Sequence, residues 1–275
     1  MIHLKDVSYR YPVLNGQGQP ALTGVSLHIA AGEMVAVAGA AGSGKTTLIQ
    51  HLNGLLSPTS GRVHINGQAM ETETELNRAR QLVGLVFQFP EAQFFEETVS
   101  REVGFGPRNR GWTGDRIQTA VKKSLHQVGF ESESIGSRSP FDLSGGEKRR
   151  VAIASTLAME TEVLVLDEPT VGLDRRSARA IENILTEVHA QGRTVILVTH
   201  DMDLIARLCR RVLVLNRGRL CFDGAPEALF HDGPLLQKAG LEPPSVMRYL
   251  AALKAQGRHV PEGCLTLEAL QQKLN

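Results

Sequence analysis

A glycine-rich loop constrains this 275-residue chain more than any other feature of its sequence. Residues 39–46 read Gly-Ala-Ala-Gly-Ser-Gly-Lys-Thr and match the pattern GxxxxGK[ST]. The apolar run at residues 34–38 predicts a strand before the loop, and the leucine spacing of residues 46–56 predicts a helix after it. A strand, a glycine loop and a helix in this order form the context in which the motif binds phosphate groups.

The residue types of this loop suit an anionic ligand. Glycines let backbone N–H groups curl around an anion, and the N-terminus of the following helix adds a favourable dipole. Lys45 is placed to reach the β- and γ-phosphates of a nucleotide, and the Thr46 hydroxyl is placed to ligate Mg²⁺. The predicted nucleotide-binding residues here are Gly39, Ala40, Ala41, Gly42, Ser43, Gly44, Lys45, Thr46 and Thr47.

Composition excludes several other classes of protein. Thirty Lys and Arg against 29 Asp and Glu give a formal net charge of +1. This is no basic field for nucleic acid, so we predict no nucleic-acid partner. The three cysteines form no CxxC pair, which disfavours a disulfide framework or a zinc site. The longest uncharged apolar stretch, residues 34–44, is too short to span a bilayer. We expect a soluble chain, or one that reaches a membrane only through a partner.

Two apolar runs predict a parallel sheet. Residues 163–166 and 195–198 are continuously apolar, as in strands that are buried on both faces. The helical pattern of residues 178–189 lies between them, which makes a βαβ unit. The predicted fold class is therefore α/β.

The remaining elements flank this core. Alternating residues 1–35 predict short antiparallel strands, and residues 15–20 (NGQGQP) carry a turn signal. Further predictions are a strand at 82–87, a mostly helical region at 97–160, a hairpin at 212–222, and short amphipathic helices near 245–254 and 266–274. Ser245 is a candidate helix cap after two prolines.

Two adjacent acids, Asp167 and Glu168, end the apolar run that begins at residue 163. Because side chains alternate along a strand, the two carboxylates should point in different directions. In a P-loop fold, Asp167 would hold Mg²⁺, directly or through water, and Glu168 would face the attacking water as a general base. Strand ends often carry solvated acids, but a phosphate loop upstream favours the catalytic interpretation.

Residues 143–147 (Leu-Ser-Gly-Gly-Glu) resemble the LSGGQ signature of ATP-binding cassette (ABC) ATPases. Other motifs of that family follow in order, and the resemblance covers residues 1 to about 230. The matching residues are Tyr11 as the adenine-stacking aromatic, Gln88 of the Q-loop, Asp174 of the D-loop and His200 of the switch motif. Tyr9 is a second candidate for the adenine contact.

The resemblance implies roles for these residues and a P-loop NTPase (RecA-like) parallel core sheet. This core would carry an N-terminal antiparallel β subdomain and a helical signature subdomain at about 89–160. Two chains would pack head to tail around two ATP molecules. The implied sets are Glu168 and His200 for catalysis, Thr46, Gln88 and Asp167 for Mg²⁺, and Ser144, Gly145, Gly146 and Glu147 as the signature acting on the partner's γ-phosphate. Glu147 departs from the usual Gln.

Two further stretches of sequence resemble one particular group within the ABC ATPases. Residues 86–99 and 50–61 resemble the ATPases of energy-coupling factor (ECF) transporters, in particular the second of two paralogues. In that family two ATPases drive a membrane scaffold, and a separate membrane subunit binds the vitamin or metal ion. The resemblance therefore places the chain at the cytoplasmic face of the membrane through its partners. Phe89, Phe94 and Phe95 would border the groove for the scaffold's coupling helices.

The resulting prediction is an ABC ATPase domain at 1–232 with a C-terminal helical extension at 233–275 for dimerisation or complex contact. The working pair is a homodimer or a heterodimer with a paralogue. The alternatives are an ordinary binding-protein-dependent importer ATPase, a soluble cassette ATPase, and a kinase or GTPase. The last two are disfavoured, because the chain has one cassette and no NKxD motif.

Overall fold

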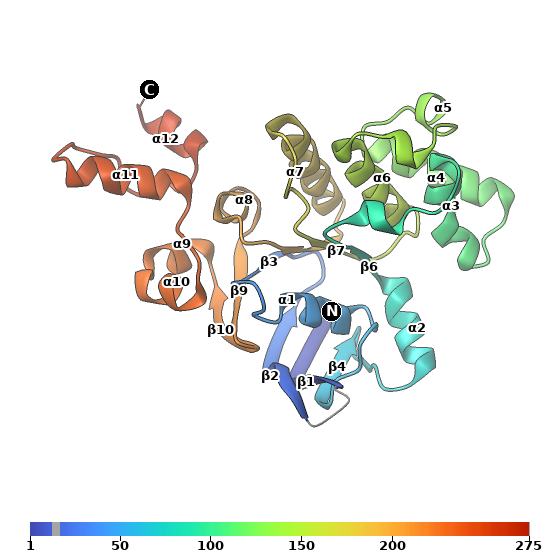
Figure 1. Cartoon of the computed structure of the whole chain (residues 1–275), viewed down its shortest axis with the longest axis horizontal. Helices are drawn as coiled ribbons and strands as arrows, with labels where there is room; N and C mark the ends of the chain where they lie inside the picture. Colours follow the sequence, from blue (N-terminus) through green and yellow to red (C-terminus); the bar gives the residue numbers. More distant parts are fainter. Residues whose placement is uncertain (13–16, 275) are drawn as a thin grey trace.

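The computed structural model describes residues 1–12 and 17–274 (Figure 1). One of its two sheets is antiparallel, in the order β2-β1-β4-β5. Its strands are β1 (Ile2–Pro12), β2 (Gln17–Ile29), β4 (Ser60–Ile65) and β5 (Gln68–Ala69). The predicted antiparallel strands are confirmed, although they are long. The predicted turn is wrong at residues 17–20, which belong to β2, while residues 15 and 16 lie outside the described part.

The second sheet carries the core of the fold, in the order β10-β9-β3-β8-β7-β6. Its pairings are parallel except for the β9–β10 hairpin. The strands are β3 (Met34–Ala38), β6 (Val83–Val86), β7 (Val163–Asp167), β8 (Thr194–Val198), β9 (Arg211–Asn216) and β10 (Arg219–Gly224). Because the strands are parallel, the segments that follow β3, β7 and β8 meet at one edge of the sheet.

The continuous apolar runs are explained by burial on both faces of this sheet. Along β3, Met34, Ala36 and Ala38 pack into one core, while Val35 and Val37 pack into another. The second core also contains the antiparallel sheet and helix α1 (Lys45–Leu52). The first contains α7 (Arg175–Ala190), α8 (Met202–Leu208) and the helical region. The phosphate loop is therefore held between two layers.

The predicted helical region is confirmed. It contains α3 (Val99–Asn109), α4 (Gly114–Gln127), α5 (Ser132–Ile135) and α6 (Gly145–Leu157), together with the 3₁₀ turns η1 (Pro90–Gln93) and η2 (Pro140–Asp142). Helix α2 (Glu73–Leu82) was not predicted, because Ala79 is its single buried residue. Helix α1 ends at Leu52 rather than near residue 56, since Gly54 then takes a left-handed turn at φ +71°.

The C-terminal part has two segments. Helices α9 (Pro226–His231) and α10 (Gly233–Ala239) pack on the main core, which Leu236, Ala239 and Leu241 join. The C-terminal helix pair, α11 (Ser245–Ala255) and α12 (Leu267–Leu274), stands apart from the sheets in Figure 1. Its small core consists of Val246, Leu250, Cys264 and Leu270, with Val260 packed against them.

The sequence predicted Ser245 as the N-cap of α11, and this prediction is wrong. Pro244 takes the N-cap position, and Ser245 is the first helical residue. The Ser245 hydroxyl instead donates to Asp203 of α8 at 2.6 Å, and its backbone N–H donates to the same carboxylate at 2.8 Å. Ser245 therefore ties the C-terminal helix pair to the core. None of the helices within residues 1–12 and 17–274 is long and apolar enough to cross a membrane.

Candidate nucleotide site

The phosphate loop after β3 needs its glycines. Gly39, Gly42 and Gly44 have φ angles of +147°, +73° and +105°, a region that other residues rarely adopt. A Cβ atom on Gly39 would lie 2.2 Å from the Leu215 carbonyl oxygen, and one on Gly44 would lie 2.6 Å from the Ala21 carbonyl oxygen. Gly44 is the N-cap of α1 and offers no side-chain cap. The loop therefore leaves backbone N–H groups available to an anion.

Two polar side chains of this loop also suit a phosphate ligand. The Lys45 ammonium donates to the carbonyl oxygens of Gly39 and Ala40 at 2.8 and 3.0 Å, so it lies across the loop. Burial lowers the pKa of Lys45, and the charges of Glu168 and Asp167 oppose that shift. The buried Ser43 hydroxyl has no hydrogen-bond partner among the described residues. An anion bound here would satisfy both groups.

Thr46 and Asp167 meet at the start of α1. The Thr46 hydroxyl donates to the Asp167 carboxylate at 3.2 Å, although the residues are far apart in sequence. Burial raises the pKa of Asp167, and the Glu168 charge acts in the same direction. The hydrogen bond from Thr46 and the Lys45 ammonium act against it. A hydroxyl and a carboxylate are oxygen ligands of the kind that Mg²⁺ prefers, so this pair fits the ion.

Glu168 faces a different set of partners. Its carboxylate accepts a hydrogen bond from the Thr199 hydroxyl at 3.0 Å, and its other oxygen lies 2.6 Å from His200 Nδ1. The Glu168 backbone N–H donates to Val198 O at 2.8 Å, in a left-handed conformation with φ +48°. Asp167 therefore faces α1 while Glu168 faces the segment after β8, which confirms the predicted divergence of the two acids.

The start of α6 carries the residues that resemble the signature. Ser144 is the N-cap: its hydroxyl accepts from the Glu147 backbone N–H, and the Glu147 carboxylate accepts from the Ser144 backbone N–H. Gly145 is exposed, and a Cβ atom on it would meet nothing within 4 Å. A Cβ atom on Gly146 would lie 2.5 Å from the Ser177 hydroxyl of α7. Close helix packing explains Gly146, whereas nothing in the structure of one chain requires glycine at position 145.

Comparison with known proteins decides the family. The family model described as ABC transporter matches residues 22–171. The energy-coupling factor transporter ATP-binding protein EcfA2 of Clostridium tetani is 40% identical over 99% of this chain and 96% of its own length. The protein of the same name from Clostridium perfringens is 43% identical over 92% of this chain and 90% of its own length. This chain belongs to the energy-coupling factor ATPases of the ABC transporter family.

Solved structures agree with this assignment. CbiO1 of Clostridium perfringens, described as part of the ABC transporter complex CbiONQ, matches with a TM-score of 0.77 and 34% identity. The match covers 92% of this chain and 98% of CbiO1. An ATP-binding cassette solved as a dimer with ADP and phosphate matches with a TM-score of 0.73 and 29% identity, over 82% of this chain and 99% of its own. The predicted family and fold class are therefore confirmed.

The other predicted residues of this energy-coupling factor ATPase surround the same edge of the sheet. The Tyr11 hydroxyl lies 3.1 Å from the Thr47 hydroxyl and 3.4 Å from Gln50 Oε1, and the Tyr11 ring packs edge-on against Tyr9. The Tyr11 side chain is 44% exposed, so a flat ligand has access to it. Gln88 is half-buried beyond β6, the strand that pairs with β7. Its placement next to the strand of Asp167 is compatible with the predicted metal role.

The predicted D-loop residue has a structural task in one chain. Asp174 caps α7 by accepting hydrogen bonds from the backbone N–H groups of Arg176 and Ser177, and from the Ser177 hydroxyl. Ser177 is also the residue that faces Gly146. The predicted D-loop residue and the start of α6 are therefore neighbours.

Sequence reasoning missed two residues that hold Glu168. Thr199 donates to its carboxylate, and Arg149 of α6 donates to its backbone carbonyl oxygen at 3.2 Å. Thr199 could have been suspected, because it lies between an apolar strand and the predicted switch histidine. Arg149 gave no such signal, since it sits in a basic run that reads as a solvated helix face, yet it is buried.

Proposed function

We propose that this energy-coupling factor ATPase hydrolyses ATP at composite sites between two chains packed head to tail. The phosphate loop of one chain would hold ATP, and Ser144 with the backbone of Gly145 and Gly146 would contact its γ-phosphate from the partner chain. The free N–H groups at the start of α6 suit that role. The related cassette was solved as a dimer with ADP and phosphate, which supports a dimeric working form.

One observation carries the catalytic part of the proposal. Glu168 is the only carboxylate bonded to both Thr199 and His200 within the described residues, and it lies one residue beyond the acid that faces Thr46. In our proposal Glu168 takes a proton from the attacking water. His200 and Thr199 hold the carboxylate in place for this step. Both side chains lie within hydrogen-bond distance of this carboxylate, Thr199 at 3.0 Å and His200 at 2.6 Å.

Thr46, Gln88 and Asp167 would hold Mg²⁺ beside the phosphates. The ion, when bound, would neutralise charge on the β- and γ-phosphate oxygens. Lys45 would give up its bonds to Gly39 and Ala40 and donate to those oxygens instead. Tyr11 would stack on the adenine ring.

The partners proposed for this chain follow from its family. The pair of ATPases, either two copies or this chain with a paralogue, would drive a membrane scaffold subunit at the cytoplasmic face of the membrane. A separate membrane subunit would bind the vitamin or transition-metal ion. Phe89 and Phe95 are each 58% exposed around η1, which suits an apolar contact with scaffold helices. Phe94 is buried in the core, so it would not take part in that contact.

Replacement of Glu168 by Gln tests the general-base assignment. The amide is nearly isosteric and retains hydrogen bonding, but it does not accept a proton from water. Phosphate release by the assembled transporter should fall about 10²- to 10⁴-fold, while equilibrium ATP binding persists. Glu187→Gln, at an exposed position of α7, is the matched control and should remain active. A Glu168→Gln complex that hydrolyses ATP within threefold of the unmodified complex would disprove the assignment.

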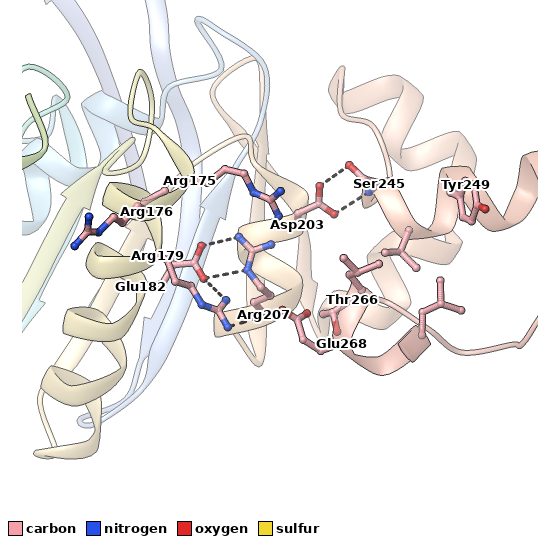
Figure 2. Close-up of a pocket in the computed structure, with 14 residues that line it drawn as sticks. Arg175, Arg176, Arg179, Glu182, Asp203, Arg207, Ser245, Tyr249, Thr266 and Glu268 are labelled. Atoms are coloured by element: carbon pink, nitrogen blue, oxygen red, sulfur yellow. Dashed lines mark hydrogen bonds and ion pairs between the residues drawn. The ribbon is translucent and has the colours of Figure 1, made fainter. Parts of the chain in front are cut away.

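The C-terminal helix pair is proposed as a contact within the transporter. Figure 2 shows how it faces α7 and α8 across a cavity of about 810 Å³. Two links cross this cavity: Ser245 to Asp203, and Glu268 to Arg179 at 3.8 Å. Tyr249 and Leu267 are 58% and 50% exposed, which leaves apolar surface for a partner.

Removal of residues 244–275 tests this contact. The cut spares Leu241, which belongs to the main core, so the ATPase core should still fold and bind ATP. We expect weaker association with the partner ATPase or with the membrane complex. Sedimentation velocity of the truncated and complete chains, with ATP present, measures the first. Co-purification with the membrane subunits measures the second. Equal association in both assays would exclude the proposal.

A further inference from the structure

The first turn of α6 carries a carboxylate, Glu147, at the place where the proposed ligand is a phosphate group. Two negative charges would therefore meet there. Glu147 Oε2 accepts hydrogen bonds from the Ser144 backbone N–H and from the Ser144 hydroxyl, both at 2.8 Å. A serine hydroxyl has one proton to donate. Both donors of Ser144 are therefore engaged by Glu147 within the same chain, and neither is available to an incoming phosphate.

Glu147 keeps its charge in this position. The hydrogen bond from the Ser144 backbone N–H lowers the pKa of Glu147 most, followed by the bond from the Ser144 hydroxyl and the charges of Arg138 and Arg150. The carboxylate is therefore ionised at neutral pH. Arg138 lies on the other side, with Nη1 3.5 Å from Glu147 Oε1.

We propose that Glu147 sets the ATP concentration at which two chains close around nucleotide. Its carboxylate holds the Ser144 donors and repels the partner's γ-phosphate, and it releases Ser144 when it turns toward Arg138. The inference rests on the proposed contact of Ser144 with ATP in the partner chain. In this proposal Glu147 acts in two ways, by holding the Ser144 donors and by the charge of its carboxylate, and Arg138 pairs with that carboxylate when Ser144 is released.

The substitution Glu147→Gln removes the negative charge but keeps the hydrogen bonds that cap α6. Gln completes a capping box as Glu does, so α6 keeps its N-terminal hydrogen bonds. Two unit charges about 4 Å apart in water interact with an energy equivalent to about fivefold in an equilibrium constant. The KM for ATP should therefore fall about fivefold, while kcat stays within twofold.

Arg138→Gln is the companion variant. Without Arg138 the carboxylate loses its second partner, so the KM for ATP should rise. In the Glu147→Gln background, Arg138→Gln should have no effect of its own, because Arg138 acts through Glu147. Glu133→Gln, at an exposed residue of α5 that pairs with Lys122, removes a charge from the same subdomain and should leave KM unchanged.

The measurement is phosphate release against ATP concentration in the complex purified through this chain. A second readout is the ATP concentration that half-saturates association of Glu168→Gln chains, with and without Glu147→Gln. An unchanged or higher KM in Glu147→Gln would overturn the inference. Ser144→Arg in the same assay tests the underlying proposal, since full activity there would reject the contact with the partner's ATP. An inactive Ser144→Arg beside an unchanged KM in Glu147→Gln would reject the role of Glu147 alone.

Discussion

The starts of helices α1 and α6 offer backbone N–H groups in different ways. The loop before α1 reaches its shape through three glycines with positive φ, and Lys45 bridges it through two carbonyl oxygens. The start of α6 is an ordinary capped helix in which Ser144 and Glu147 satisfy each other. In our proposal the first is a phosphate site complete within one chain. The second would become a phosphate site only when the nucleotide of a partner chain displaces its internal bonds.

Loss of Lys45 should weaken ATP binding at the loop before α1, and this is the largest effect that we expect. In Lys45→Ala the loop loses its one ammonium group, which would make charge-assisted hydrogen bonds to two phosphates. At about 1.5–3 kcal/mol for each bond, ATP affinity should fall about 10²- to 10⁴-fold. Isothermal titration with Mg-ATP measures this change.

The control for this experiment is Lys254→Ala, at an exposed position of α11 far from the loop in sequence. Thermal unfolding of both variants should stay close to that of the unmodified chain, because Lys45 lies at the surface end of a buried element. Unchanged Mg-ATP affinity in Lys45→Ala would contradict the assignment of residues 39–47 as the nucleotide site.

The two sites also differ in how far sequence could predict them. The loop at residues 39–46 is a local pattern, and its flanking strand and helix are visible as apolar runs, so its structure could be predicted in detail. The partners of Glu168 could not. Thr199 reaches it from the segment after β8 and Arg149 from α6, and only the packing of these elements brings them together.

The elements that were missed have weak burial signals. Helix α2 is held at its start by a capping box of Thr72 and Glu75. It fully buries only Ala79, while Leu76 and Leu82 are partly buried against the same core, so its apolar face is narrow. Strand β5 has two residues, too few for an alternation to be read. The sequence shows that Glu147 departs from the usual Gln, but only the structure shows that its carboxylate is hydrogen-bonded to Ser144.

Substitutions of Gly44 and Gly145 compare the two sites further, and their effects should be smaller than that of Lys45→Ala. Gly44 has φ +105°, and a Cβ atom would lie 2.6 Å from the Ala21 carbonyl oxygen, so Gly44→Ala should destabilise the chain by about 1–3 kcal/mol. Gly145 begins α6 in open space, where a methyl group meets nothing. Gly145→Ala should therefore stabilise the chain by about 0.4–1 kcal/mol, because alanine loses less conformational entropy on folding.

Although Gly145→Ala should stabilise the chain, it should lower the ATPase activity of the assembled complex. The added methyl group would hold the partner's γ-phosphate away from the Gly145 backbone N–H. A hydrogen bond to a charged group contributes about 1.5–3 kcal/mol, so ATP turnover of the assembled complex should fall about tenfold to a hundredfold. Denaturant unfolding of the single chain and phosphate release by the complex measure the two quantities separately. A variant that is both more stable and less active identifies Gly145 as a residue kept for the partner's nucleotide. If Gly145→Ala destabilised the chain as Gly44→Ala does, the distinction between a preformed site and one completed by assembly would be lost.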